Sequence, residues 1–269
     1  MRDITLGQYF PSNSIIHRLD PRIKILLLVL YIVLIFCTFT YLSLLLIFIS
    51  TLIIIYLSKV PVRLYFKSLK VIIIIVLITS ILNLFYGTGE ALFEFGFIKI
   101  TMNGINNAIF VTFRIVSLIL ISSCLTFTTM PTDLTDALER LLKPLTVFHI
   151  KVHEIAMMMT IALRFVPTLL EETDKIMSAQ KARGADMESG SFTRRIKALI
   201  PVLVPLFVSA FRKAYDLAMA MECRCYTGGS GRTRMKQLHL KKSDFVAIAV
   251  FILIISGVVL CNVFLPRVK

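Results

Sequence analysis

Two arginines stand near the ends of two similar stretches of this 269-residue chain. Arg183 follows Pro167 by 16 residues of helical pattern, and Arg224 follows Pro205 by 19. A guanidinium group is a planar fork that binds a carboxylate through two parallel hydrogen bonds. An arginine in the last turn of a helix also complements the helix dipole, which is worth about 0.3–1 kcal/mol. The spacing alone therefore leaves two roles open, docking to a partner or compensation of the dipole.

Glycines follow both arginines and predict where the two helices end. Gly184 comes directly after Arg183 and predicts a left-handed cap, which glycine adopts without steric cost. The second helix is expected to end at Arg224, with Gly228 and Gly229 beyond it. Both arginines would then project from helix ends.

Methionines are frequent in the same two stretches. Their flexible thioethers suit surfaces that accept several partners, although they also fill gaps in a protein core. Two roles are therefore open for these methionines, a surface that binds a partner or packing inside a core. The residues are Met157, Met158, Met159, Met177, Met219 and Met221.

Other residues that could do chemistry do not form recognisable sites. The glycine-rich segment at 228–233 lacks the lysine of a phosphate-binding loop, so nucleotide binding is expected on partners. Cys223 and Cys225 form a lone C-x-C motif, whereas a zinc site needs about four ligands. His149 and His153 lack the H-E-x-x-H order and are expected to be a solvated pair. We expect no catalytic residue, no metal site and no cofactor bound by this chain.

The composition is that of a membrane protein. Apolar residues make up 57% of the chain, and the mean hydropathy is +0.83. The formal net charge is +14, which in a membrane protein marks cytoplasmic segments and does not indicate nucleic-acid binding. The lipid bilayer is thus the expected surrounding, and nucleic acid is not an expected partner.

The apolar runs predict an all-α polytopic protein with about five clear transmembrane helices, and six to eight spans as the alternative. Ile25–Ser58 contains no charge over 34 residues, about 51 Å as one helix, against a hydrocarbon core of about 30 Å. It should therefore form two short antiparallel spans that turn near Thr38–Tyr41. Further spans are expected over Val71–Tyr86, Ile105–Thr129 and Phe245–Leu265.

Basic residues predict the orientation of these spans. The segment before Ile25 and the loop at 59–70 each carry four Lys or Arg, so both should be cytoplasmic. The loop at 87–104 has one lysine and two glutamates and should lie outside. Within it Phe93, Phe95 and Phe97 alternate, which predicts a small hairpin or an interfacial aromatic ledge.

The charge pattern divides the chain into three regions. Residues 1–129 form the expected N-terminal membrane domain with four helices, and 244–269 the C-terminal transmembrane helix. Residues 130–243 carry 18 Lys or Arg against 11 Asp or Glu and form the expected coupling-helix domain on the cytoplasmic side. Its apolar runs, Ile155–Leu170 and Ala198–Phe211, favour long amphipathic helices against the membrane, with two additional short spans as the alternative.

Two charged residues lie in or beside the expected spans. Arg114 falls well inside the fourth span, where an unpaired charge is costly, so a functional role or a structural pairing is expected. Asp20 lies between Arg18 and Arg22 and is expected to be a structural link at the membrane surface.

With these residues in view, the chain resembles the transmembrane T component of energy-coupling factor transporters, the EcfT/CbiQ family. The likeness covers nearly the whole length. It is carried by GQYFPSNSIIHRLDPRIK (Gly7–Lys24), TFTTMPTDLTDALERLLKPL (Thr126–Leu145), ALRFVPTLLEETDKIMSAQKARGAD (Ala162–Asp186) and AMECRCYTGG (Ala220–Gly229).

The resemblance implies that two X-Arg-X motifs dock into grooves of two ABC-type ATPase subunits, which are identical or different. The matching triplets are Ala182-Arg183-Gly184 and Cys223-Arg224-Cys225; the second has cysteines where alanine and glycine are frequent. The crossed helices would present an apolar surface to a membrane-embedded substrate-binding S component. ATP and Mg would bind to the ATPases, and the assembly would import vitamins or metal ions across a prokaryotic cell membrane.

Two other classes of protein fit the sequence less well. A secondary transporter should carry ionisable residues near the middle of several spans, where Arg114 is nearly alone. A membrane-embedded hydrolase needs a nucleophile, a base or a metal cluster, and the expected spans contain none. A coupling subunit that is not itself an enzyme is the leading hypothesis.

Overall fold

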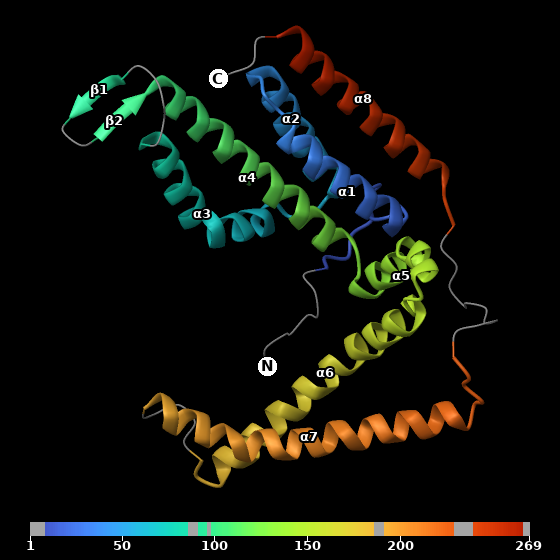
Figure 1. Cartoon of the computed structure of the whole chain (residues 1–269). Helices are drawn as coiled ribbons and strands as arrows, with labels where there is room; N and C mark the ends of the chain where they lie inside the picture. The colour runs from blue at the N-terminus through green and yellow to red at the C-terminus, as the bar shows by residue number, and fades with distance from the viewer. Residues whose placement is uncertain (1–8, 86–90, 96–97, 186–190, 229–238, 266–269) are drawn as a thin grey trace. The chain divides into compact units, whose positions relative to one another are not determined.

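The computed structural model describes residues 9–85, 91–95, 98–185, 191–228 and 239–265, and these are mostly α-helical (Figure 1). The elements are α1 (Pro21–Phe36), α2 (Tyr41–Ser58), α3 (Val62–Phe85), β1 (Ala91–Phe95), β2 (Ile98–Thr101), α4 (Met102–Thr128), α5 (Pro131–Leu141), the short 3-10 helix η1 (Lys143–Phe148), α6 (Val152–Ala182), α7 (Phe192–Glu222) and α8 (Lys242–Phe264).

The chain forms two compact units. The first, called here the bundle unit, includes Gly7–Ala137 and Lys236–Lys269 and therefore contains α1–α4 and α8. The second, called the arm unit, includes Leu138–Met235 and contains α6 and α7. The functional boundaries expected near residues 130 and 243 stay a prediction.

Five helices within the described residues are long and apolar enough to cross a membrane, which confirms the expected number. They are α2, α3 over Val62–Leu84, α4, α6 and α8. The membership differs from the expected set, because α1 has only 16 residues, about 24 Å, which is shorter than a hydrocarbon core of about 30 Å. In its place α6 qualifies, with 31 residues from Val152 to Ala182.

The turn between α1 and α2 lies where the sequence predicts it. Thr40 caps α2, since its side chain accepts a hydrogen bond from the Ser43 amide while the Ser43 hydroxyl accepts one from the Thr40 amide. Inside the pair, the Tyr31 hydroxyl lies 2.9 Å from the Ile47 carbonyl oxygen and 2.6 Å from Ser50 Oγ. These contacts fix α1 against α2.

The core of the bundle unit consists of two apolar clusters. One lies among α1, α2, α4 and α8 and includes Tyr31, Ile47, Ile121 and Phe251. The other lies where α2 meets α3 and α4 and includes Tyr65 and Phe127, whose rings meet edge to face at 5.2 Å. Most other apolar side chains of these helices point outward, as expected of surfaces that face lipid.

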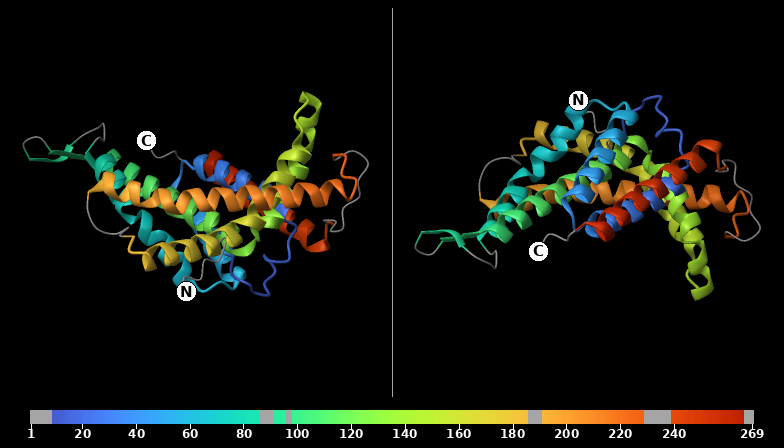
Figure 2. Two further views of the ribbon diagram at one scale, coloured as in Figure 1. Left: turned by 90° about the horizontal axis from the view of Figure 1, so that it is seen from below. Right: turned by 90° about the horizontal axis from the view of Figure 1, so that it is seen from above.

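The hairpin predicted from the alternating phenylalanines is present. Strands β1 and β2 pair antiparallel, with Glu94 opposite Lys99 and Phe95 opposite Ile98. The hairpin extends from the ends of α3 and α4 (Figures 1 and 2). Phe97 lies outside the described residues.

Candidate docking site at two helix ends

The end of α6 forms a complete left-handed cap around Arg183. Gly184 adopts φ +86°, and its amide donates to the Lys181 carbonyl at 3.0 Å. The Ala185 amide reaches back to the Gln180 carbonyl at 3.0 Å. This pair of hydrogen bonds is the Schellman motif, which satisfies carbonyls that a helix end leaves free. The glycine cap expected from the sequence is confirmed.

The end of α7 repeats this geometry around Arg224. Cys225 adopts φ +53°, and its amide donates to the Glu222 carbonyl at 2.8 Å. The Tyr226 amide donates to the Met221 carbonyl at 3.1 Å. Cys225 thus takes the place that Gly184 has in α6, although a side chain in the left-handed region costs about 1–2 kcal/mol.

The two triplets therefore have the same backbone geometry around their shared arginine, although the flanking residues differ. Arg183 and Arg224 each occupy the last position before the left-handed residue, and both are exposed. Within the described residues neither guanidinium forms an ion pair, so each is available to a carboxylate from another molecule. The left-handed conformation of Cys225 was not predicted from the sequence. The one feature that could have indicated it is that Cys225 follows Arg224 as Gly184 follows Arg183.

Polar contacts hold α6 and α7 together where they cross (Figure 1). The Glu172 carboxylate accepts a hydrogen bond from Ser209 Oγ at 2.5 Å and pairs with the Lys213 ammonium. Further along α6, Gln180 Nε2 donates to the Pro201 carbonyl at 3.4 Å. These contacts join the two helices in antiparallel order.

Both helices continue through their prolines. α6 contains Pro167, and α7 contains Pro201 and Pro205, yet each helix is 31 residues long. The expectation of long helices is thus confirmed. By length and composition α6 also qualifies as a membrane span, whereas α7 is not among the five candidates in the described residues.

One face of α7 is apolar and exposed among the described residues. Its exposed side chains recur every three or four residues, which is the spacing of one helix face. They include Ile200, Leu203, Phe207, Phe211 and Tyr215.

The six methionines of α6 and α7 are exposed or half-buried. Met158, Met159 and Met219 are exposed, whereas Met157, Met177 and Met221 are half-buried. None of the six is buried, so the structure does not place them in a closed core of the arm unit.

The two histidines singled out in the sequence, His149 and His153, lie in different elements. His149 ends η1 at φ +62°, outside α6, so it does not share a helix face with His153 as a pair would require. His153 Nδ1 instead lies 2.9 Å from Glu139 Oε1. Within the described residues no three His, Cys, Asp or Glu side chains cluster as metal ligands would.

Arg114 braces the turn between α1 and α2. Its guanidinium donates to the Thr38 carbonyl and lies 5.7 Å from the centre of the Phe110 ring. Asn262 Nδ2 of α8 donates to the adjacent Cys37 carbonyl at 2.7 Å. The structural pairing weighed for Arg114 is thus observed.

Buried charges connect the start of α1 to its neighbours. Asp20 caps α1 by accepting from the Arg22 amide, and its own amide donates to the fully buried Asp244 carboxylate of α8 at 2.9 Å. Lys24 Nζ donates to the Thr128 carbonyl at 3.0 Å and to Thr129 Oγ1 at 3.2 Å. The structural link expected at Asp20 is observed, and its place at the membrane surface stays a prediction.

Comparison with known proteins gives concordant matches over most of the chain. The family model CbiQ, described as cobalt transport protein, matches residues 12–236. The energy-coupling factor transporter transmembrane protein EcfT of Clostridium kluyveri is 53% identical over 249 residues, 92% of each chain. The EcfT proteins of Ruminiclostridium cellulolyticum and Bacillus subtilis are 50% and 46% identical, over 97% and 88% of this chain and 97% and 90% of theirs.

Proposed function

This chain belongs to the CbiQ family, as a multi-pass transmembrane component of the energy-coupling factor type, and from that premise we propose that it couples ATPase subunits to a separate substrate-binding protein. Its site would be the pair of triplets Ala182-Arg183-Gly184 and Cys223-Arg224-Cys225. The membrane would be a prokaryotic cell membrane, and the imported solute a vitamin or a metal ion.

The observation that carries this proposal is the repetition of one cap geometry at two helix ends. Arg183 and Arg224 have the same backbone setting, are exposed and lack ion-pair partners within the described part of the chain. Dipole compensation alone does not require the same cap twice, with a strained Cys225 in the second. Two identical forks suit two related partners, each with a carboxylate in a groove.

The partners for these forks are ABC-type ATPase subunits, either two copies of one or two different ones. The glycine-rich segment that begins at Gly228 has no phosphate-binding lysine, so ATP and Mg belong on the partners. This chain would therefore be a coupling subunit and not an enzyme.

The apolar face of α7 is the surface proposed for the membrane-embedded S component. Phe207 is 61% exposed and Phe211 73% exposed, as large apolar side chains are at interfaces that a partner completes. Met219 continues this face four residues after Tyr215, and Met158 and Met159 of α6 are also exposed, with adaptable side chains. Specificity for the solute would then reside in the S component.

The test is affinity purification of the tagged chain in gentle detergent, with mass spectrometry of what co-purifies. We expect ATPase subunits and one small membrane protein with the unmodified chain. Arg183→Ala together with Arg224→Ala should remove most of the ATPase, whereas a single replacement should retain assembly and lower transport per ATP hydrolysed.

The matched control is Arg164→Ala with Arg212→Ala, which removes one exposed arginine from each helix away from its end. This control should purify with its ATPases. Recovery of no ATPase with the unmodified chain would refute the proposal. Equal transport by the double helix-end replacement would refute the coupling role and leave a scaffold role.

A further inference from the structure

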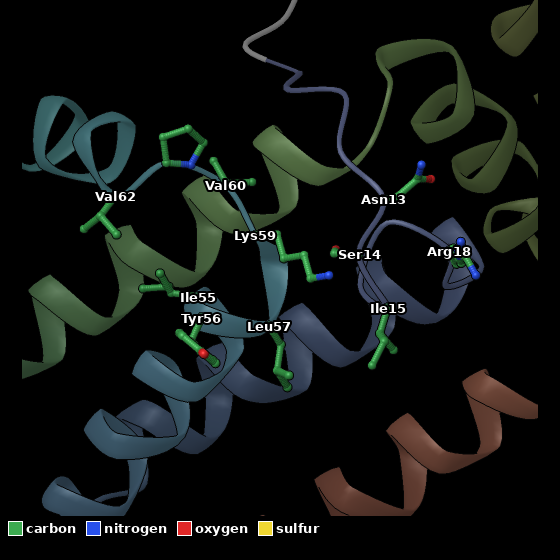
Figure 3. A pocket seen from close by; sticks show the side chains of 11 residues that line it. Asn13, Ser14, Ile15, Arg18, Ile55, Tyr56, Leu57, Lys59, Val60 and Val62 are labelled. Carbon is green, nitrogen blue, oxygen red and sulfur yellow. The ribbon is translucent and has the colours of Figure 1, made fainter.

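Two adjoining cavities lie in the bundle unit where α1 begins and α2 ends. One, called here the basic pocket, has about 600 Å³ and lies between the loop before α1 and the α2–α3 turn (Figure 3). The other, called the apolar pocket, has about 320 Å³ and lies among α1, α2, α4 and α8. Ile15 and Leu57 line both, so the two pockets share a wall.

The basic pocket presents two cationic side chains. Arg18 comes from the loop before α1, and Lys59 extends from the α2–α3 turn toward Ser14 (Figure 3). Neither forms an ion pair with any described residue. No Asp or Glu is among the described residues that line this pocket, so its charge is uncompensated.

The backbone holds Lys59 in this position at a cost. Lys59 adopts φ +54°, which an L side chain rarely takes. Ser58, just before it, receives a hydrogen bond from Ser12 Oγ to its carbonyl at 3.3 Å, and Ser58 Oγ lies 3.1 Å from the Tyr65 hydroxyl. A strained residue kept by a buried network is a frequent sign of function.

The apolar pocket has the opposite character. Aliphatic side chains such as Leu27, Leu28, Val250 and Ile254 form its walls, and no described Asp or Glu lines it. Lys24, the one cation among the described residues that line it, is already bonded to the Thr128 carbonyl and Thr129 Oγ1. The pocket therefore suits a hydrocarbon chain.

We propose that one anionic phospholipid binds across the two pockets, with its phosphate beside Lys59 and Arg18 and an acyl chain in the apolar pocket. A bilayer supplies such a lipid at high local concentration, and lysine and arginine near a membrane surface attract anionic headgroups. A soluble anion would leave the apolar pocket empty. A zwitterionic lipid has no net charge, so the two cations would add little to its binding free energy. This inference is independent of the ATPase-docking proposal.

The test is native mass spectrometry of the full chain in detergent, titrated with phosphatidylglycerol or with phosphatidylcholine of the same acyl chains. Phosphatidylglycerol should bind more tightly. Arg18→Gln with Lys59→Gln should weaken it by about 30-fold, since each cation near a headgroup contributes about fivefold. The matched control, Lys67→Gln with Lys70→Gln, removes two exposed charges of α3 outside both pockets and should change binding little.

A second pair of variants tests the apolar pocket. Ala247→Phe puts a ring into its wall and should lower the binding of both lipids, whereas Ala249→Phe, exposed on the same helix outside the lining, should not. A larger side chain can disturb packing, so gel filtration checks that both variants are folded. The Arg18→Gln, Lys59→Gln variant is an independent test, because it adds no bulk. Equal binding of the two lipids, an equal loss in both charge variants, or displacement by excess glycerol 3-phosphate would overturn the proposal.

Discussion

At the scale of single residues, the left-handed cysteine at the end of α7 carries a measurable strain. Cys225→Gly removes a side chain from φ +53° and should raise the stability of this helix end by about 1 kcal/mol. Gly184→Ala, at φ +86° with open space around it, should lower that of the α6 end by a similar amount. Hydrogen exchange of the Tyr226 and Ala185 amides measures both changes. Slower exchange in both variants would contradict the conclusion that the two helix ends share one cap geometry.

His17 gives the bundle unit a dependence on pH. Burial lowers the pKa of His17 below its usual 6.5, and the nearby Lys24 lowers it further, while the hydrogen bond to the Phe10 carbonyl raises it. Between the folded pKa and pH 6.5 the unfolded chain binds more protons than the folded one, so stability should fall as the pH drops from 6.5 towards the folded pKa. Thermal unfolding at pH 7.5 and 5.5 measures this, and His17→Gln should show a smaller difference.

At the scale of elements, the brace between α6 and α7 depends on one carboxylate. Glu172→Gln weakens the contacts with Ser209 and Lys213, so the described part of α7 around residue 210 should exchange its amides faster. Glu171→Gln is the control, because its side chain is exposed and has no such contact. Faster exchange in both variants would show a general effect of charge.

Arg114 tests whether a charge inside a span is structural. Arg114→Leu leaves the Thr38 carbonyl without its donor and should lower the free energy of unfolding by about 1–2 kcal/mol. Thermal unfolding in detergent measures this change. If the role is structural alone, transport per folded molecule stays unchanged; a loss of transport at full stability would point to a functional charge.

The sequence predicted the individual elements better than their assignment to the membrane. The turn after Phe36, the hairpin and the cap at Gly184 each have a local cause, in chain length, alternation or glycine. The length of α6 was expected, but its assignment was harder, because Arg164 and Pro167 interrupt its apolar run and favoured a helix lying against the membrane over a span.

At the scale of the whole molecule, the parts that the sequence did not predict depend on contacts between distant segments. Asp244 meets Asp20 across more than 220 residues, and the Glu172 brace joins two helices whose own patterns do not encode it. The two cations of the basic pocket, Arg18 and Lys59, likewise come from different loops. The cap around Cys225 was missed for another reason, since cysteine has no marked preference for the left-handed region.

The crossing of α6 and α7 has a mechanical consequence. From the Glu172–Lys213 ion pair, Arg183 lies 11 residues along α6 and Arg224 lies 11 residues along α7, about 16 Å in each case. If this ion pair is a fulcrum, the two lever arms have the same length. A given rotation then moves both arginines by the same distance, so two ATPases docked on them would be displaced equally even if their sequences differed.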